Sequence, residues 1–151
     1  LDDAADQIVK DYIQRSGVKL TIQHSDRAFY SPSSDSVTVP ELAQYTSVSE
    51  YYSTFFHELT HSTGHASRLN RLSKEASFGS ELYSKEELIA ELGAAFLVNH
   101  VGLETDGSFR NSAGYIQSWL KALKDDKKLI ISAAGKADKA VAMILGNALD
   151  E

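Results

Sequence analysis

The segment His57-Glu58-Leu59-Thr60-His61 constrains the fold of this chain more than any other feature. On a helix, residues four apart lie on one face, one turn apart, so both imidazoles can reach a single metal ion. Glu58 lies about 100° round the helix, where it can accept a proton from a water molecule that the metal activates. The motif therefore predicts a helix that carries two metal ligands and a general base.

The sequence around the motif supports a helix independently. Ser47-Val48-Ser49-Glu50 has the pattern of a capping box, so we expect a helix from there to about Ser62, with Gly64 at its end. The helix also has its own apolar side, which means that the histidines are not needed as core residues. That side is formed by Tyr52, Phe55, Phe56 and Leu59.

A catalytic metal site of this type needs a third protein ligand from elsewhere in the chain. In the longer pattern H-E-x-x-H-x-x-G-x-x-H, Gly64 matches, but the last position is Ser67. The single methionine, Met143, falls in a helical stretch and forms no Met-turn, so the metzincin pattern is excluded. We expect a carboxylate from a second helix instead.

That second helix is predicted from Ser84 to about Asn99, and it carries Glu87 and Glu91 on one face. Ala94 and Ala95 share this face, and small residues allow a neighbouring helix to approach closely. We predict that Glu87 is the third ligand and that Glu91 accepts a hydrogen bond from a ligand histidine. Glu91 and Glu86 remain alternatives for the third ligand, as do His65 and His100, and Ser84-x-x-Glu87 also fits a structural capping box.

The remainder of the sequence predicts an α+β fold, with a small N-terminal antiparallel or mixed sheet followed by a helical part that carries the site. We expect a first helix over Asp3 to Arg15. Short strands are expected over 18–23, 28–30 and 36–39, the last two forming a hairpin. Later helices are expected from Asn111 or Ser112, and from Asp126 to Leu149 with a break near Gly135.

Composition excludes several classes of protein. The 151 residues suit a single domain, 1–151, and a net charge of −6 disfavours broad contact with a phosphate backbone. The absence of cysteine excludes disulfides and thiolate metal sites. No apolar run approaches the ~20 residues of a membrane span and no signal peptide is present, so we expect a cytoplasmic protein. The first residue is Leu1, not Met, and we expect this to be the C-terminal part of a longer protein.

Several segments together carry a resemblance that covers nearly the whole chain: 29–32, 57–65, 67–71, 78–81, 86–97 and 115–120. In these segments the chain resembles the C-terminal zincin-like metallopeptidase domain of ArdC-type antirestriction proteins, found on plasmids and in phage polyvalent proteins. The arrangement is gluzincin-like. There, the third ligand is the first Glu of N-E-x-x-S-D, which corresponds to Glu87, and the Asp corresponds to Glu91, with Ala90 replacing the Ser.

The resemblance implies further features. Zincins pair an extended peptide substrate with an edge strand near the metal helix, which would here be Val37-Thr38-Val39. The family's single-stranded-DNA-binding domain lies N-terminal to this region, so we expect nucleic-acid contact through that domain and not through this chain. Ser62 stands where we associate a Trp with the family, and we expect this to alter only the wall of the site.

A peptidase also needs groups that stabilise the oxyanion or hold the substrate. By residue type the candidates are Tyr83, Tyr115, His100 and Arg68, although each also has a structural interpretation. Arg68 and Arg71 are expected to pair with nearby acids such as Glu81 or Glu86. The lysines of the last helices alternate with aspartates, which is typical of a solvated face.

These observations predict a zinc-dependent metallopeptidase that holds one Zn2+ per chain and hydrolyses a peptide or protein substrate, in an antirestriction or mobile-element setting. The alternative is a catalytically silent zinc-binding interaction module attached to a single-stranded-DNA-binding domain. Metal-dependent hydrolysis of a non-peptide substrate is a third hypothesis. The sequence makes no prediction of oligomeric state.

Overall fold

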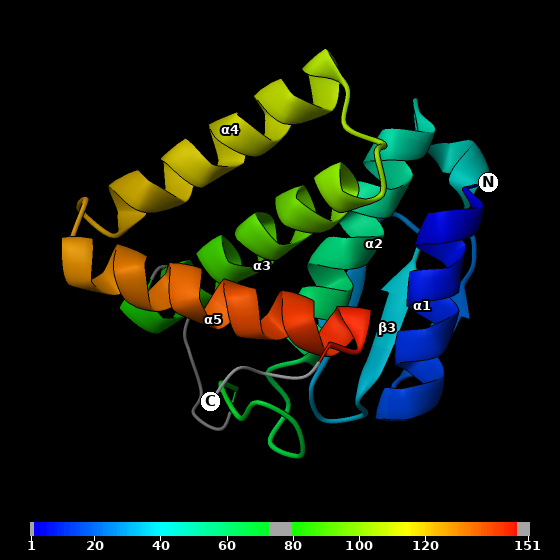
Figure 1. The fold of residues 1–151 in the computed structure, drawn as a ribbon, viewed down its shortest axis with the longest axis horizontal. Helices are drawn as coiled ribbons and strands as arrows, with labels where there is room; N and C mark the ends of the chain where they lie inside the picture. The colour runs from blue at the N-terminus through cyan, green and yellow to red at the C-terminus, as the bar shows by residue number, and fades with distance from the viewer. Residues whose placement is uncertain (1, 73–79, 148–151) are drawn as a thin grey trace.

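The computed structural model describes residues 2–72 and 80–147 and confirms the α+β class (Figure 1). The elements follow in the order helix, sheet, helices. They are α1 (Asp3–Ser16), β1 (Lys19–Ile22), β2 (Phe29–Ser31), β3 (Ser36–Val39), the 3-10 helix η1 (Leu42–Gln44), α2 (Val48–Ser62), α3 (Glu81–His100), α4 (Asp106–Ala122) and α5 (Lys127–Leu145).

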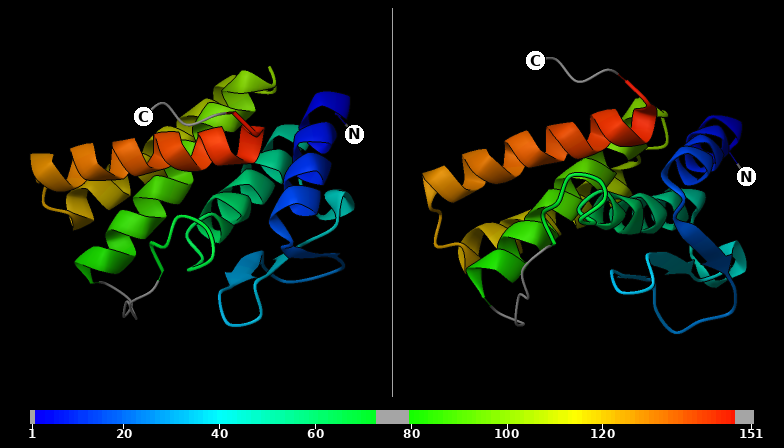
Figure 2. Two further views of the ribbon diagram at one scale, coloured as in Figure 1. Left: turned by 60° about the horizontal axis from the view of Figure 1, so that its bottom comes forward. Right: turned by 90° about the horizontal axis from the view of Figure 1, so that it is seen from below.

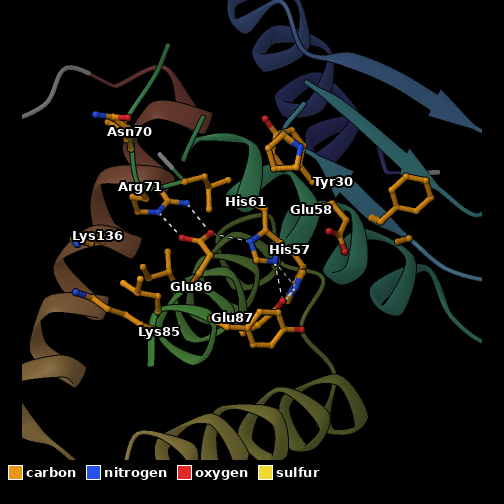
Figure 3. Close-up of a pocket in the computed structure, with 18 of the residues that line it drawn as sticks. Tyr30, His57, Glu58, His61, Asn70, Arg71, Lys85, Glu86, Glu87 and Lys136 are labelled. Atoms are coloured by element: carbon orange, nitrogen blue, oxygen red, sulfur yellow. Dashed lines mark hydrogen bonds and ion pairs between the residues drawn. The ribbon is translucent and has the colours of Figure 1, made fainter. Parts of the chain in front are cut away.

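The three strands form a mixed sheet in the order β1-β3-β2, with β1 parallel and β2 antiparallel to β3. The predicted hairpin of β2 and β3 is confirmed, but the expectation that Val37–Val39 is an edge strand is wrong. β3 is the central strand of this sheet, and Val37, Thr38 and Val39 are all buried, as is typical of a strand covered on both sides. β2 is the edge that lies nearer to the metal-binding motif (Figure 3).

Helix α2 lies between the sheet on one side and α3 on the other, and α5 crosses over α3 toward α1 (Figures 1 and 2). The main core is where α1, β3, α2 and the C-terminal ends of α3 and α5 meet, with Tyr12, Tyr52, Phe56, Leu59 and Leu97 fully buried. A smaller, separate core joins the N-terminal half of α3 to α4 and α5 through Leu88, Ile89, Leu123, Ala133 and Ala137. No helix in the described ranges is long and apolar enough to cross a membrane.

Helix α3 begins earlier than the sequence predicted, and this changes the interpretation of Glu87. Ser80 is the N-cap, and its side chain accepts a hydrogen bond from the Tyr83 amide. Ser84 is therefore a buried residue inside the helix, and the capping box that it would form with Glu87 is not present. The structural interpretation of Glu87 is removed, which leaves its carboxylate available for the site.

The later helices also differ from prediction at their boundaries. Helix α4 begins after Thr105, because Thr105 and Ser108 form a reciprocal capping box, and not at Asn111 or Ser112. Helix α5 continues without a break through Gly135 and ends at Gly146, whose φ of 75° closes the helix in the left-handed region. Residues 148 and 149 of the predicted last helix lie outside the described residues.

One glycine sets the distance between α2 and α3. A Cβ built on Gly93 would lie 2.7 Å from Thr60 Oγ1 and 2.8 Å from its Cγ2. Thr60 is fully buried and its hydroxyl is bound to the Phe56 carbonyl, so it has little room to move. Gly93 thus permits the close crossing that brings the acidic face of α3 against the histidines of α2.

Candidate metal centre

Three potential metal ligands converge between α2 and α3. The Nε2 atoms of His57 and His61 lie 3.2 Å apart, and both face the Glu87 carboxylate. Its oxygens lie 3.1 Å from His57 Nε2 and 3.4 Å from His61 Nε2. Two imidazole nitrogens and one carboxylate from two helices thus surround a single point (Figure 3).

The spacing of these atoms fits a divalent metal ion. In a tetrahedral site with bonds of about 2.0–2.1 Å, neighbouring ligand atoms are about 3.3–3.4 Å apart. The separations in this cluster are close to that value: 3.2 Å between the two Nε2 atoms, 3.1 Å from His57 Nε2 to Glu87 Oε2, and 3.4 Å from His61 Nε2 to Glu87 Oε1. Two histidines and one carboxylate are also a donor set that catalytic zinc sites use, with the fourth position left for water or substrate.

The second nitrogen of each histidine is held by its own carboxylate. His57 Nδ1 lies 3.3 Å from Glu91 Oε1, and His61 Nδ1 lies 2.8 Å from Glu86 Oε2. A carboxylate in this position orients the ring and directs the Nε2 lone pair toward the metal. Glu91 lies where the sequence predicted a carboxylate for a ligand histidine, and Glu86 occupies the corresponding position for the other histidine.

Glu86 and Arg71 are supporting residues that the sequence analysis did not assign to this role. Arg71 Nε and Nη2 donate to the two oxygens of Glu86 at 2.9 and 3.2 Å, which is a bidentate pair. Arg71 also donates to Thr63 Oγ1 and to the Thr60 carbonyl at the end of α2. The predicted pairing of Arg71 with a nearby acid is confirmed, and it fixes the carboxylate that holds His61.

The chain after α2 folds back to bring Arg71 to this position. The Arg71 and Leu72 amides both donate to the Gly64 carbonyl, and Asn70 has a φ of 55° in the left-handed region. A Cβ on Gly64 would lie 3.0 Å from Arg71 Nη2, so glycine leaves room for the guanidinium. The only sequence signal for this return loop is the pair Gly64 and Asn70, residue types that favour turns.

Burial and the neighbouring charges shift the pKa values of the cluster in opposite directions. Burial alone would lower the pKa of His57, but Glu87 and Glu91 outweigh it and raise it to about 10. Burial would also lower the pKa of His61, but Glu86 and Glu87 outweigh it and raise this pKa to about 9. Burial would raise the pKa of Glu87, but the two histidines hold it well below its usual range. Two protonated rings among carboxylates thus hold positive charge at this point, and a metal ion bound there would take the place of the ring protons.

Glu58 is placed apart from the three ligands, beside them in the same cleft. Its side chain lies toward the β2 side of the histidines, where Tyr30 is also found (Figure 3). Burial raises the pKa of Glu58, opposed by the neighbouring His57 and His61 and aided by Glu87 and Glu91. A carboxylate with a raised pKa next to a metal site has the character of a general base.

These residues line a cleft of about 920 Å³ between β2, α2, the 69–72 segment, α3 and α5. Lys85, Lys136 and Lys139 line its α5 side, while Phe29 and Tyr30 of β2 line the opposite side. Burial and the neighbouring Lys136 amino group lower the pKa of Lys85. The cleft is open to solvent and large enough for several residues of an extended peptide.

Of the four residues predicted to stabilise an oxyanion or hold substrate, only Tyr83 lines the cleft. Burial raises its pKa, as do the charge of Glu87 and a hydrogen bond to it. Arg68 lies outside, where it pairs with Asp35 and donates to the Ser16 and Ser62 carbonyls. Tyr115 is 59% exposed on α4, and His100 stacks on Phe96 at the end of α3.

Two further sequence expectations concern residues near the end of α2. Ser62 is fully buried and its hydroxyl is 2.8 Å from that of Tyr12, so it belongs to the α1–α2 packing and not to the wall of the cleft. His65 bonds to Ser67 in the return loop and is not among the metal-binding cluster of the described residues.

A family model matches most of the chain. Residues 7–136 match the family model described as zincin-like metallopeptidase. The chain belongs to this family. The matched residues include the sheet, the metal-binding cluster and about the first half of α5, up to Lys136.

Individual relatives are similar to most of this chain. Two Escherichia coli proteins named DNA primase TraC are each 45% identical over 127 residues, which are 84% and 83% of this chain but only 9% and 12% of those proteins. An uncharacterised protein of Sinorhizobium fredii is 36% identical over 121 residues, 80% of this chain and 39% of that protein.

The Mn(II)-bound crystal structure of the antirestriction protein ArdC from plasmid R388 matches with a TM-score of 0.75 and 42% identity, covering 97% of this chain and 54% of that chain. The metal-free ArdC structure matches with a TM-score of 0.73 and 40% identity, over 95% and 50%. The expected resemblance to ArdC-type proteins is thus confirmed. The zincin-like domain spans about half of ArdC and a small part of the TraC proteins.

Proposed function

We propose that this zincin-like domain is a zinc-dependent metallopeptidase, with His57, His61 and Glu87 as metal ligands and Glu58 as the general base. The observation that supports the proposal most strongly is the convergence of the three ligand atoms, with Glu58 beside them, in an open cleft bordered by a strand edge. Each of these groups has a role in peptide hydrolysis: the three ligands would hold the metal, Glu58 would act as the general base, and the strand edge would bind the substrate backbone.

A divalent metal in this site would act as a Lewis acid, activating water and polarising the scissile carbonyl. Glu58 accepts a proton from the attacking water as its oxygen bonds to the carbonyl carbon. Glu58 then delivers the proton to the amide nitrogen as the C–N bond breaks, and the amine leaves. Tyr83 is hydrogen-bonded to Glu87 beside the metal site. From this position its hydroxyl is proposed to donate to the oxyanion that forms during the attack.

The substrate is proposed to bind as an extended strand along β2. In the described sheet β2 pairs only with β3, so its other edge has free amide and carbonyl groups. Phe29 and Tyr30 line the cleft, and main-chain pairing there would lead a peptide past Glu58 to the metal ligands. This proposal replaces the expected pairing with Val37–Val39, which are bound on both sides.

Zinc is the proposed metal because imidazole and carboxylate ligands in this number suit it, although the ArdC relative was crystallised with Mn(II). We further propose that the chain is one domain of a longer protein, since it spans at most about half of its relatives. An antirestriction setting, with a DNA-binding domain N-terminal to this one, is proposed from the similarity to ArdC.

The test is peptide cleavage by the zinc-loaded domain, measured by mass spectrometry on a proteome-derived peptide library. Glu58→Gln keeps the shape of the side chain but removes the base, so cleavage should fall by roughly 10²–10⁴-fold while zinc content is unchanged. Cleavage that persists in this variant would overturn the role of Glu58. Full zinc binding with no cleavage of any peptide would favour the silent interaction module.

A further inference from the structure

None of the three lysines that line the cleft has a role in the hydrolysis described above, and two of them, Lys85 and Lys136, stand out. Lys85 lies on α3 and Lys136 on α5, and both line the cleft on the side away from β2. Among the lysines that the structure describes, these two alone are half-buried, and all the others are exposed. A lysine loses hydration when it is even partly buried, so two such residues at one place require a reason.

The two amino groups also lie close to each other, and no acid of the described residues pairs with either of them. Their side chains are close enough to interact directly, so two positive charges repel one another. No ion pair joins either amino group to a carboxylate in the described part of the chain. Of the acids on α3 near Lys85, Glu86 is already bound by Arg71 and His61, and Glu81, one helical turn earlier, forms no ion pair with Lys85. An anion from outside the chain would remove this repulsion.

The charge of the cleft as a whole differs from that of the chain. The chain carries a net charge of −6, yet the cleft is lined by five Lys or Arg side chains against three Glu. A bound divalent metal would make the cleft more positive still. Such a cleft in an acidic domain attracts anionic ligands selectively to this one place.

The position of the lysines relates them to a bound peptide. Lys85 and Lys136 lie at one end of the cleft, Tyr30 of β2 lies at the other, and the histidines lie between them (Figure 3). Side chains of an extended peptide project to either side of its backbone. A peptide on β2 would direct one set of its groups across the metal centre toward the α3–α5 corner.

We propose that Lys85 and Lys136 form a carboxylate-binding subsite of the cleft, so that the domain selects peptides with an acidic group on the α5 side of the metal centre. The inference rests on the proposed peptidase function and adds the substrate class. The carboxylate comes either from an Asp or Glu side chain or from the C-terminus of the peptide. A carboxylate has two oxygens, one for each ammonium group.

A peptide carboxylate fits this pair better than a nucleic-acid phosphate backbone does. Backbone binding requires positive charge distributed along an exposed track. The remaining lysines of the last helices are instead interspersed with Asp125, Asp126 and Asp138. The two half-buried lysines form a single recessed point, which suits one anionic group.

The test compares peptide binding by anisotropy, using decapeptides of one neutral sequence that carry an uncharged fluorophore. One set is amidated with Asp at each position in turn, a matched set has Asn there, and a third peptide is neutral with a free C-terminal carboxylate. Metal-free protein is used first, because a metal would itself bind carboxylates, and zinc-loaded Glu58→Gln protein is used second.

We expect Asp at one position, or the free C-terminus, to tighten binding about tenfold relative to its matched peptide, as for a charge-assisted hydrogen bond to a half-buried group. Tighter binding of an Asp-containing peptide would identify a side-chain carboxylate as the ligand, and tighter binding of the peptide with a free C-terminus would identify the terminal carboxylate. Lys85→Met and Lys136→Met should each remove most of this preference while retaining the aliphatic stem. Lys128→Met, on the exposed part of α5 outside the cleft, changes the net charge equally and should keep the preference.

Several outcomes would overturn the inference. They are equal binding of acidic and neutral peptides, failure of every acidic peptide to bind, and a preference that survives the double substitution of Lys85 and Lys136. Binding of a single-stranded DNA oligonucleotide that depends on the two lysines, without any peptide preference, would overturn it as well. Lys→Gln variants replace any Lys→Met variant that fails to fold by circular dichroism.

This experiment separates the subsite from the peptidase proposal. Carboxylate preference is measured without turnover, so it stands even if no cleavage is ever observed. Cleavage without any preference for acidic peptides would leave the peptidase proposal intact and overturn only the subsite.

Discussion

The α2–α3 crossing buries very different groups from the packing of α4 and α5 on α3, although α3 takes part in both. At the crossing, six ionisable side chains lie within two helices and are mostly shielded from water: His57, Glu58, His61, Glu86, Glu87 and Glu91. A small apolar core holds α4 and α5 on α3, and Phe109, Tyr115 and Ile131 remain exposed on the surface of α4 and α5. The crossing is thus specified by directional contacts between charged groups, and the packing of α4 and α5 on α3 by apolar area.

The two regions should therefore tolerate different kinds of substitution. A buried charge that loses its partner is costly, whereas an exposed apolar group contributes little to stability. Substitutions at the crossing should therefore affect metal binding and stability together. Substitutions on the outer faces of α4 and α5 should affect neither, and the following experiments test this contrast.

The largest effect is expected from Glu87→Ala, measured as zinc per chain by elemental analysis. Removing one of three protein ligands should lower zinc content from about one per chain to a small fraction after dialysis. Glu104→Ala, outside both cores, is the control and should bind zinc as the parent does. Full zinc in the Glu87 variant would contradict the proposed ligand set and favour Glu86 or Glu91.

The next effect concerns the carboxylates that hold the rings. Glu86→Gln should lower zinc affinity by about 10–100-fold, measured by competition with a chelating dye, because His61 loses its orienting charge. Arg71 would also lose its ionic partner, so the midpoint of thermal unfolding should fall. Glu91→Gln should act less strongly, since its contact with His57 is 3.3 Å against 2.8 Å for Glu86 and His61. Equal effects of the two variants would contradict this order.

The same substitution at two glycines, one in each region, allows a direct comparison of their effects on stability. Gly93→Ala should destabilise the chain by about 1–3 kcal/mol and weaken zinc binding, because the new methyl group would overlap Thr60. Gly135→Ala in α5 meets nothing within 4 Å and should stabilise by about 0.5–1 kcal/mol through helix propensity alone. Urea unfolding measures both, and a destabilising Gly135→Ala would contradict the open environment of that position.

The smallest effect is a pH dependence at Asp35, which pairs with Arg68 beside the C-terminal end of α2. Burial raises the pKa of Asp35, but hydrogen bonds from Arg68 and Tyr30 outweigh it and hold the pKa below its ordinary value of 3.8. The group therefore stabilises the fold above about pH 4, and this stabilisation is lost as the pH falls through the lower folded pKa. We expect the loss to be under about 1 kcal/mol in urea unfolding of the parent between pH 5 and pH 3. Asp35→Asn should lack this component, and an unchanged pH profile in that variant would contradict it.

Local patterns predicted the metal helix well. The capping pattern at Ser47 and the apolar side of α2 gave its bounds, and the α+β class and the zincin-like family are confirmed. The ligand roles of His57, His61 and Glu87 remain predictions, now supported by convergent geometry. Helical spacing was sufficient to group the predicted ligands because all three lie on two helices.

Features that depend on distant parts of the chain were missed. The order of the strands is set by how β1 pairs with β3, and a four-residue strand such as Ser36–Val39 does not reveal whether it is central. The pairing of Arg71 with Glu86 requires the return loop at Gly64, and no local pattern specifies its path. The start of α4 was missed because Ser108, and not Glu or Gln, completes the capping box with Thr105.

The acidic face of α3 has a consequence for the genetics of this domain. Glu86, Glu87 and Glu91 each meet a different atom of the His57 and His61 rings, so their spacing is matched to one register of the two helices. Deletion of a single codon between Glu87 and Glu91 would rotate one part of α3 by about 100° relative to the other and separate these partners. Related genes should therefore show amino-acid substitutions along this stretch but no insertions or deletions. Insertions should occur instead in the turn between α3 and α4.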